Sequence, residues 1–145
     1  MVAEILVEET RLPLTVEMVE TGRQFVRQLQ QNVALTAGFW LFVSESNSWR
    51  LYVATADLRD RGARPLYLIA QRLLQEQRHL QAMKGEIQGS LFTLTLPDIY
   101  AVDDRQQLVG TLRTLAERQN RRADFRVSRT AASGHFIEDA YIYTI

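Results

Sequence analysis

Two strand-like segments joined by a short polar connection constrain the fold of this chain more than any other feature. The first segment, Ala37–Val43, is apolar throughout, rich in aromatic residues and too short for a typical helix, which is typical of a strand covered on both faces. Five polar residues (SESNS) follow it. The second segment, Trp49–Thr55, alternates, so Arg50 and Tyr52 point away from the face that carries Leu51. This pattern predicts a β-hairpin whose first strand is central in a sheet.

The rest of the chain reads as further helices and strands. Thr15 is a suitable N-cap for a first helix, and Pro65 suits the first turn of a second. Asp103 with Gln106 resembles a capping box and predicts the start of a third helix. The expected elements are a weak strand at 4–8, helices at 16–33, 65–79 and from 103, a charged loop at 57–62, and strands at 91–96, 125–128 and 136–145.

This order predicts an α+β fold with a single antiparallel or mixed sheet of about five strands and three helices, the helices lying on one face. The 145 residues fit one domain, residues 1–145, because no repeat or Pro/Gly/Ser-rich linker divides them.

Composition excludes several kinds of protein. The chain has no cysteine, so no disulfide or thiolate site can form. The start of the chain carries no basic leader before an apolar run, which argues against a secretory signal. Its apolar runs are far shorter than the roughly 20 residues of a membrane span. We therefore expect a cytoplasmic protein that does not enter a membrane.

Charge is balanced over the whole chain but unevenly placed. Residues 1–20 hold five glutamates and one arginine, a net charge of −4, whereas residues 113–129 hold six arginines and two carboxylates, a net charge of +4. The basic segment could neutralise phosphates while Phe125 stacks on a base. Its candidate nucleic-acid contacts are Arg118, Arg121, Arg122, Phe125, Arg126 and Arg129. The alternative is a solvated turn that pairs with the acidic N-terminal segment or with a neighbouring subunit.

Motifs for catalysis are scarce. The phosphate-binding patterns GxxxxGK[ST] and GxGxxG, the metal-binding pattern HExxH and the nucleophile pattern GxSxG are all absent. With only two histidines, we expect no metal and no cofactor. If the chain is an enzyme, the best acid–base candidate is a histidine and a carboxylate on one strand face, His135 and Asp139, with Arg50 or Tyr52 of the hairpin as the other wall. The alternative is a strand entry whose charges discourage aggregation.

The charged loop that follows the hairpin is a second candidate site. It offers arginines near the start of a helix, where an anion could bind. The candidate residues are Tyr52, Asp57, Arg59, Asp60, Arg61 and Arg64. The alternative is a connecting loop with internal ion pairs.

Two segments, SWRLYVATADLRDRGARPLY (48–67) and IEDAYIYTI (137–145), resemble a group of small uncharacterised bacterial proteins. That group has a similar W-R-L-Y hairpin, a glycine-containing loop into a helix and a terminal I-E-D-A-Y-I-Y strand. The resemblance implies a bacterial cytosolic protein with a shared scaffold, and it carries over no catalytic or binding residue.

The leading hypothesis is a non-enzymatic protein that acts through protein–protein interaction or homo-oligomerisation. It is motivated by the missing catalytic motifs and by aromatic residues that could populate one exposed sheet face as interface anchors, namely Tyr52, Tyr141, Tyr143 and a tryptophan. The alternatives are a nucleic-acid accessory protein that uses Arg118–Arg129 and an enzyme of unrecognised type.

Overall fold

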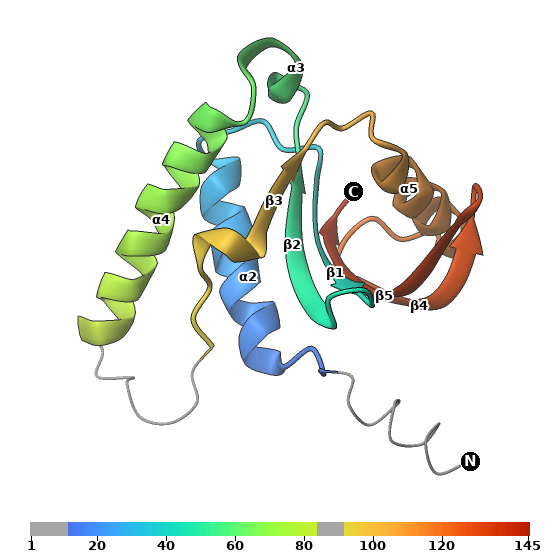
Figure 1. Ribbon diagram of the computed structural model, residues 1–145, viewed down its shortest axis with the longest axis horizontal. Helices are drawn as coiled ribbons and strands as arrows, with labels where there is room; N and C mark the ends of the chain where they lie inside the picture. Colours follow the sequence, from blue (N-terminus) through green and yellow to red (C-terminus); the bar gives the residue numbers. More distant parts are fainter. Residues whose placement is uncertain (1–11, 84–91) are drawn as a thin grey trace.

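Five strands form one mixed sheet in the computed structural model of the chain, which describes residues 12–83 and 92–145 (Figure 1). The strand order across the sheet is β3-β2-β1-β5-β4, and only the β2–β3 pair is parallel. The strands are β1 (Ala37–Val43), β2 (Ser48–Ala54), β3 (Ile99–Val102), β4 (Phe125–Ala132) and β5 (His135–Thr144). The helices are α2 (Val16–Gln30), α3 (Asp57–Arg61), α4 (Arg64–Met83) and α5 (Gln107–Gln119), with a 3-10 turn η1 (Leu96–Asp98). The predicted α+β fold with a single mixed sheet is confirmed.

The predicted hairpin is the centre of this sheet. β1 and β2 pair antiparallel from Ala37 opposite Ala54 to Val43 opposite Ser48. Trp40 of β1 belongs to the apolar cluster that contacts α2 and α4, and its neighbour Phe39 belongs to the cluster that contacts α5. Both side chains are fully buried, which explains why β1 is apolar at every position.

Helices cover both faces of the sheet, so the expectation of helices on one face is wrong. Figure 1 shows α2 and α4 on one side and α5 on the other. The apolar stripe of α5, which includes Val109 and Leu112, packs with Phe39 and Ile142. A central strand that is apolar on both faces needs a covering layer on each.

The strand expected at 91–96 is wrong for the residues that the structure describes. Residues 92–95 have no regular structure, and β3 starts only after Pro97. The Asp98 carboxylate accepts hydrogen bonds from the Thr95 N–H and the Thr95 hydroxyl, both at 2.9 Å. This side-chain cap closes η1, so Pro97 precedes a strand instead of ending one.

The helix starts and ends follow from local hydrogen bonds. Thr15 caps α2 as predicted, since its Oγ1 accepts the Met18 N–H at 3.2 Å. The third helix begins at Gln107, later than predicted, because the Asp103 carboxylate accepts the Arg105 N–H at 2.8 Å and closes a separate turn. The second helix, α4, continues beyond the expected end at residue 79. The loop expected at 57–62 contains the short helix α3. The strand expected at 4–8 lies outside the described residues.

The β4–β5 hairpin changes faces along its length. Arg129 has a backbone φ of 47°, a left-handed conformation that is uncommon for arginine. It lies between Ser128 and Thr130, which both pair with β5. Val127 and Ala132 both belong to the cluster under α5, although strict alternation would place them on opposite faces. The alternation therefore reverses at Arg129.

The expectation that Tyr52, Tyr141 and Tyr143 share one exposed face of the sheet is also wrong. Tyr52 stacks on Phe39 on the α5 side, with ring centroids 5.3 Å apart. Tyr141 and Tyr143 contact each other on the α2 side, and Tyr143 is only 6% exposed. The three rings are divided between the two faces because β2 and β5 present them on opposite sides of the sheet.

Candidate functional site

The two outer edges of the sheet differ in how their backbone groups are satisfied. At the β3 edge, the hydroxyl of Tyr67 on α4 accepts the Ala101 N–H at 2.9 Å and donates to the Ile99 carbonyl oxygen at 3.3 Å. These backbone groups are therefore bonded outside the β2–β3 ladder. β3 is also only four residues long. A short strand with a side chain on its backbone groups leaves little room for a further strand.

The opposite edge is longer and more open. β4 spans eight residues and is the last strand of the sheet, so no strand within residues 12–83 and 92–145 pairs with its outer side. Ser128, Arg129 and Ala131 are exposed along it. The Thr130 hydroxyl donates to the Ser128 carbonyl oxygen at 2.8 Å, beside the Arg129 kink. We call this outer side of Phe125–Ala132 the β4 edge.

A buried carboxylate orients one arginine of the β4 edge. Asp139, whose side chain is 5% exposed, accepts two hydrogen bonds from Arg126, at 2.9 Å from Nε and 2.7 Å from Nη2, and one from the Ser128 hydroxyl at 3.0 Å. The hydrogen bond to Asp139 raises the pKa of Arg126. The Arg126 guanidinium also lies 5.9 Å from the Trp49 ring centroid, so it is held on two sides.

The residues of the enzyme hypothesis are not brought together. Arg50 lies over the Tyr100 ring at 4.5 Å, next to the stacked Tyr52 on the α5 side. Asp139 binds Arg126 over Trp49 on the α2 side. His135 lies opposite Ala132 at the far end of the hairpin. On β5, Ile137 and Ala140 both belong to the cluster under α5, so the alternation also reverses on this strand and separates His135 from Asp139, which a simple alternation would have placed on one face.

The charged loop is divided rather than gathered into one site. Arg59 bonds Asp103 at 3.2 Å and also pairs with Asp104, and the first of these bonds raises its pKa. Asp57 and Arg61 turn instead toward a small hollow of about 60 Å³ beside α4. Asp60 and Arg64 are exposed, and Tyr52 lies away from all of them, between Phe39 and Tyr100. Among the described residues only Arg59 of this loop forms an ion pair, and its partners Asp103 and Asp104 lie outside the loop, so the internal ion pairs of the structural alternative are not seen there either.

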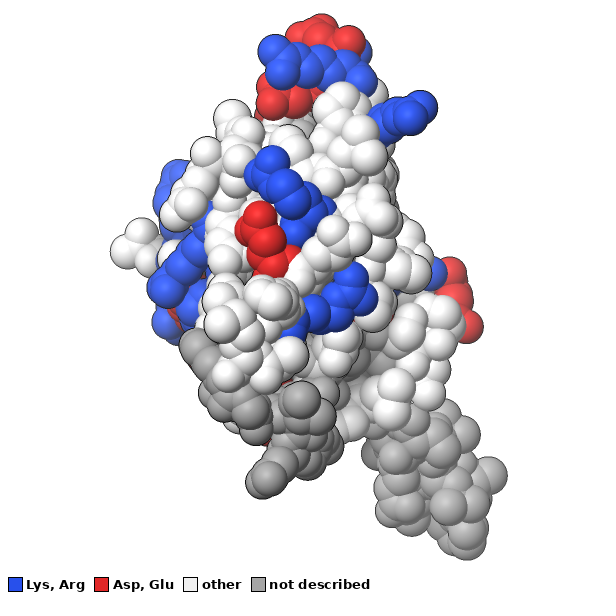
Figure 2. All heavy atoms as spheres, turned by 90° about the vertical axis from the view of Figure 1, so that its left-hand side faces the viewer, with Lys and Arg blue, Asp and Glu red and all other residues white. Residues whose placement is uncertain are grey.

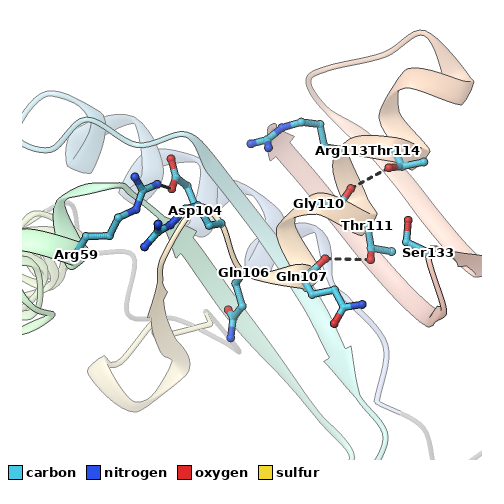
Figure 3. A pocket seen from close by; sticks show the side chains of 10 residues that line it. Arg59, Asp104, Gln106, Gln107, Gly110, Thr111, Arg113, Thr114 and Ser133 are labelled. Atoms are coloured by element: carbon cyan, nitrogen blue, oxygen red, sulfur yellow. Dashed lines mark hydrogen bonds and ion pairs between the residues drawn. The ribbon is translucent and has the colours of Figure 1, made fainter.

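A polar groove of about 460 Å³ runs along α5 (Figure 3). Its lining comes from α3, from the turn before α5 together with the first turns of α5, and from the β4–β5 turn. It consists of Arg59, Asp104, Arg105, Gln106, Gln107, Gly110, Thr111, Arg113, Thr114 and Ser133. Figure 3 shows Arg59 and Asp104 pointing toward each other at one end, with Ser133 beside Thr111 at the other. Sequence reasoning identified only Arg59 here, because no local motif links these three segments.

Several polar groups of this groove already have partners within the protein. Thr111 and Thr114 donate to the backbone carbonyls of Gln107 and Gly110, both at 3.0 Å. Arg105 bonds Asp103 at 3.4 Å, and Arg59 is paired as described above. The groove is therefore an open polar surface in which two of its arginines are partly neutralised.

The nucleic-acid hypothesis loses its aromatic component. Phe125 is 2% exposed and packs in the core, so it cannot stack on a base. Arg126 is engaged by Asp139, and Arg121 lies 6.0 Å from the Phe125 ring centroid. Arg118, Arg121, Arg122 and Arg129 remain exposed. Figure 2 shows a different face, the α4 side, where arginines lie among carboxylates and uncharged residues.

Two other kinds of site find no support in the described chain. Within residues 12–83 and 92–145, no three acidic or histidine side chains are grouped so that they could hold a metal ion. None of the helices in these ranges has both the length and the apolarity needed to cross a membrane.

Comparison with models of known protein families, with curated proteins and with solved structures found no match to this chain.

Proposed function

We propose that this protein binds other proteins by accepting an extended segment of a partner as an additional strand on the β4 edge. The observation that carries the proposal is the difference between the two edges. Tyr67 occupies backbone groups of β3, whereas β4 offers eight residues without a neighbouring strand among the described residues. An exposed strand edge is a template for main-chain hydrogen bonds with another chain.

The β4 edge is supported by the rest of the fold. Phe125 and Val127 anchor the strand in the core under α5, and β5 pairs with it from Phe125 to Ala132. A docking strand that is already ordered costs less conformational entropy on binding than a flexible segment. The Arg129 kink divides the edge into two short runs, so we expect a partner segment of roughly four to eight residues, the usual range for strands.

Self-association was the other form of interaction left open by the sequence. Binding to a different protein is favoured, because pairing two β4 strands would place arginines on both sides of the new ladder with no carboxylate on either strand. The lack of cysteine and the resemblance to bacterial cytosolic proteins support a bacterial cytoplasmic setting as part of the same proposal.

Site-specific photo-crosslinking tests the proposal. A photoreactive phenylalanine analogue replaces Ala131, an exposed residue of β4, and in a matched control it replaces Gln75, an exposed residue of α4. The protein that crosslinks from position 131 but not from 75 is then purified and mixed with the unmodified full chain. We expect binding to slow hydrogen exchange of the backbone amides in Phe125–Ala132. Protection confined to another surface, or no position-specific crosslink, would refute the proposal.

A further inference from the structure

We infer that the partner segment bound at the β4 edge is acidic, an inference that rests on the proposed function. β4 itself contains two arginines, Arg126 and Arg129, and no carboxylate. The loop that leads into it adds Arg121 and Arg122, which are both exposed. An incoming strand therefore meets basic side chains in the loop before β4 and, at Arg129, near the middle of β4.

The carboxylates beside this edge are engaged by the protein itself. Asp139 is held by Arg126 and by the Ser128 hydroxyl. Asp124, just before β4, is paired with Arg23 of α2. Because Asp139 and Asp124 are engaged in this way, neither carboxylate neutralises the charge of the exposed Arg121, Arg122 and Arg129. Carboxylates on a partner strand would neutralise it.

Arg126 adds positive charge near this edge without facing the incoming strand. Its guanidinium hydrogen-bonds Asp139 of β5 and lies 5.9 Å from the ring centroid of Trp49 on β2. Both partners lie on the inner side of β4, so the direct contacts of a partner strand fall to Arg129 and to Arg121 and Arg122 in the preceding loop.

The same arginines select against other strands. Opposite charges on directly facing residues stabilise a strand pair and like charges destabilise it. A basic segment, or a second copy of β4, would bring arginine against arginine. An acidic segment converts each of these contacts into an attraction, so charge decides which strand the edge accepts.

Nuclear magnetic resonance with three synthetic peptides tests this inference. The probes TEVEVEVT, TQVQVQVT and TKVKVKVT share length and alternation and differ only in charge. Each is added to the ¹⁵N-labelled full chain at low salt. We expect the acidic peptide to shift the amide signals of Phe125–Ala132 and to bind about tenfold more tightly than the basic one, as two or three facing charge pairs would produce. The difference should shrink in high salt.

Charge-reversal variants identify the residues responsible. Arg129→Glu should weaken binding of the acidic peptide by about threefold or more. Arg78→Glu, on the exposed side of α4, is the matched control and should leave that affinity unchanged.

The outcomes separate the two proposals. If all three peptides shift the β4 signals with equal affinity, the acidic preference is refuted while strand addition stands. If the acidic peptide shifts signals of the α5 groove and not those of β4, or if it does not bind, the acidic preference is likewise refuted. Strand addition is then judged by the crosslinking experiment.

Discussion

The Tyr67 hydroxyl on α4 accepts the Ala101 N–H of the edge strand β3 at 2.9 Å. The same oxygen donates its proton to the Ile99 carbonyl. The Tyr67 side chain thereby satisfies the Ala101 N–H and the Ile99 carbonyl, two backbone groups that a neighbouring strand would otherwise bond. It also joins α4 to a strand that has only four residues.

Replacing Tyr67 with phenylalanine should loosen this edge. Tyr67→Phe removes both hydrogen bonds and keeps the ring, so we expect the free energy of unfolding to fall by about 1 kcal/mol. Hydrogen exchange of the Ala101 amide should become faster. Tyr100→Phe, whose ring still lies beneath Arg50, is the control. Unchanged exchange at Ala101 in Tyr67→Phe would contradict the role of the hydroxyl.

Two helical glycines should respond in opposite ways to alanine. At Gly22 of α2, a Cβ would lie 2.6 Å from the Trp40 Nε1 and still closer to the Tyr143 hydroxyl. At Gly110 of α5, a Cβ would meet no atom within 4 Å. We expect Gly22→Ala to destabilise the protein by about 1–3 kcal/mol through overpacking. Gly110→Ala should stabilise it by about 0.5–1 kcal/mol through helix propensity.

Urea unfolding of both glycine variants measures these changes. The pair controls for the substitution itself, since both replace glycine with alanine inside a helix. A stabilised Gly22→Ala variant would show that α2 can move away from the sheet without cost.

The buried Tyr143 hydroxyl should matter both for stability and for its pH dependence. It accepts the Trp40 Nε1–H at 2.9 Å and donates to the Val19 carbonyl oxygen at 2.6 Å. Tyr143→Phe leaves both groups without this partner, so we expect a loss of about 1–3 kcal/mol at neutral pH. Burial raises the pKa of Tyr143, so the folded state favours the neutral phenol.

The sign of the alkaline effect follows from this shift. The stability contributed by neutral Tyr143 is fully present below the unfolded-state pKa of about 10 and is lost as the unfolded chain ionises above it. The difference between Tyr143→Phe and the native chain should therefore shrink above about pH 10, as measured by denaturant unfolding at pH 7 and at pH 10.5. A constant difference, or an equal loss in Tyr52→Phe, would argue against this account.

Acid sensitivity should come in part from Asp103. The Arg105 backbone N–H, and then the Arg105 and Arg59 side chains, hold the pKa of Asp103 well below its usual range. The charged carboxylate is thus favoured in the folded state. Its contribution is present above the unfolded-state pKa of about 3.9 and is lost as the pH falls below that value.

Asp103→Asn keeps an acceptor for the Arg105 N–H but removes the charge. We expect this variant to be less stable than the native chain at pH 7 and the difference to shrink toward pH 2.5, as measured by urea unfolding. Asp60→Asn, an exposed carboxylate of α3, serves as the control. A difference that grows in acid would reverse the sign and reject the explanation.

The hairpin and the first helix could be predicted because their signals are local. Thr15 caps the next turn of its own helix, and the apolar run of β1 needs only a covering layer on each face. The strand after Pro97 could not be predicted in the same way. It depends on the Asp98 cap and on a parallel pairing with β2, a contact between segments almost 50 residues apart.

The candidate sites were predictable to a smaller extent. Strand alternation suggested that His135 and Asp139 share a face, but the alternation reverses between them, since Ile137 and Ala140 both lie under α5. Nothing near Asp139 in the sequence points to Arg126, which binds it across the hairpin. The α5 groove depends on three segments that meet only in space.

By itself, the sequence determined the α+β class, the central hairpin and the positions of most helices, because these follow from side-chain periodicity and from caps within a few residues. Tertiary structure alone decided which edge of the sheet is closed. Tyr67 and Ala101 are 34 residues apart, and the bond between them exists only because α4 packs beside β3. The β4 edge has no such neighbour among the described residues, and its place at the outside of the sheet follows from the order of strands.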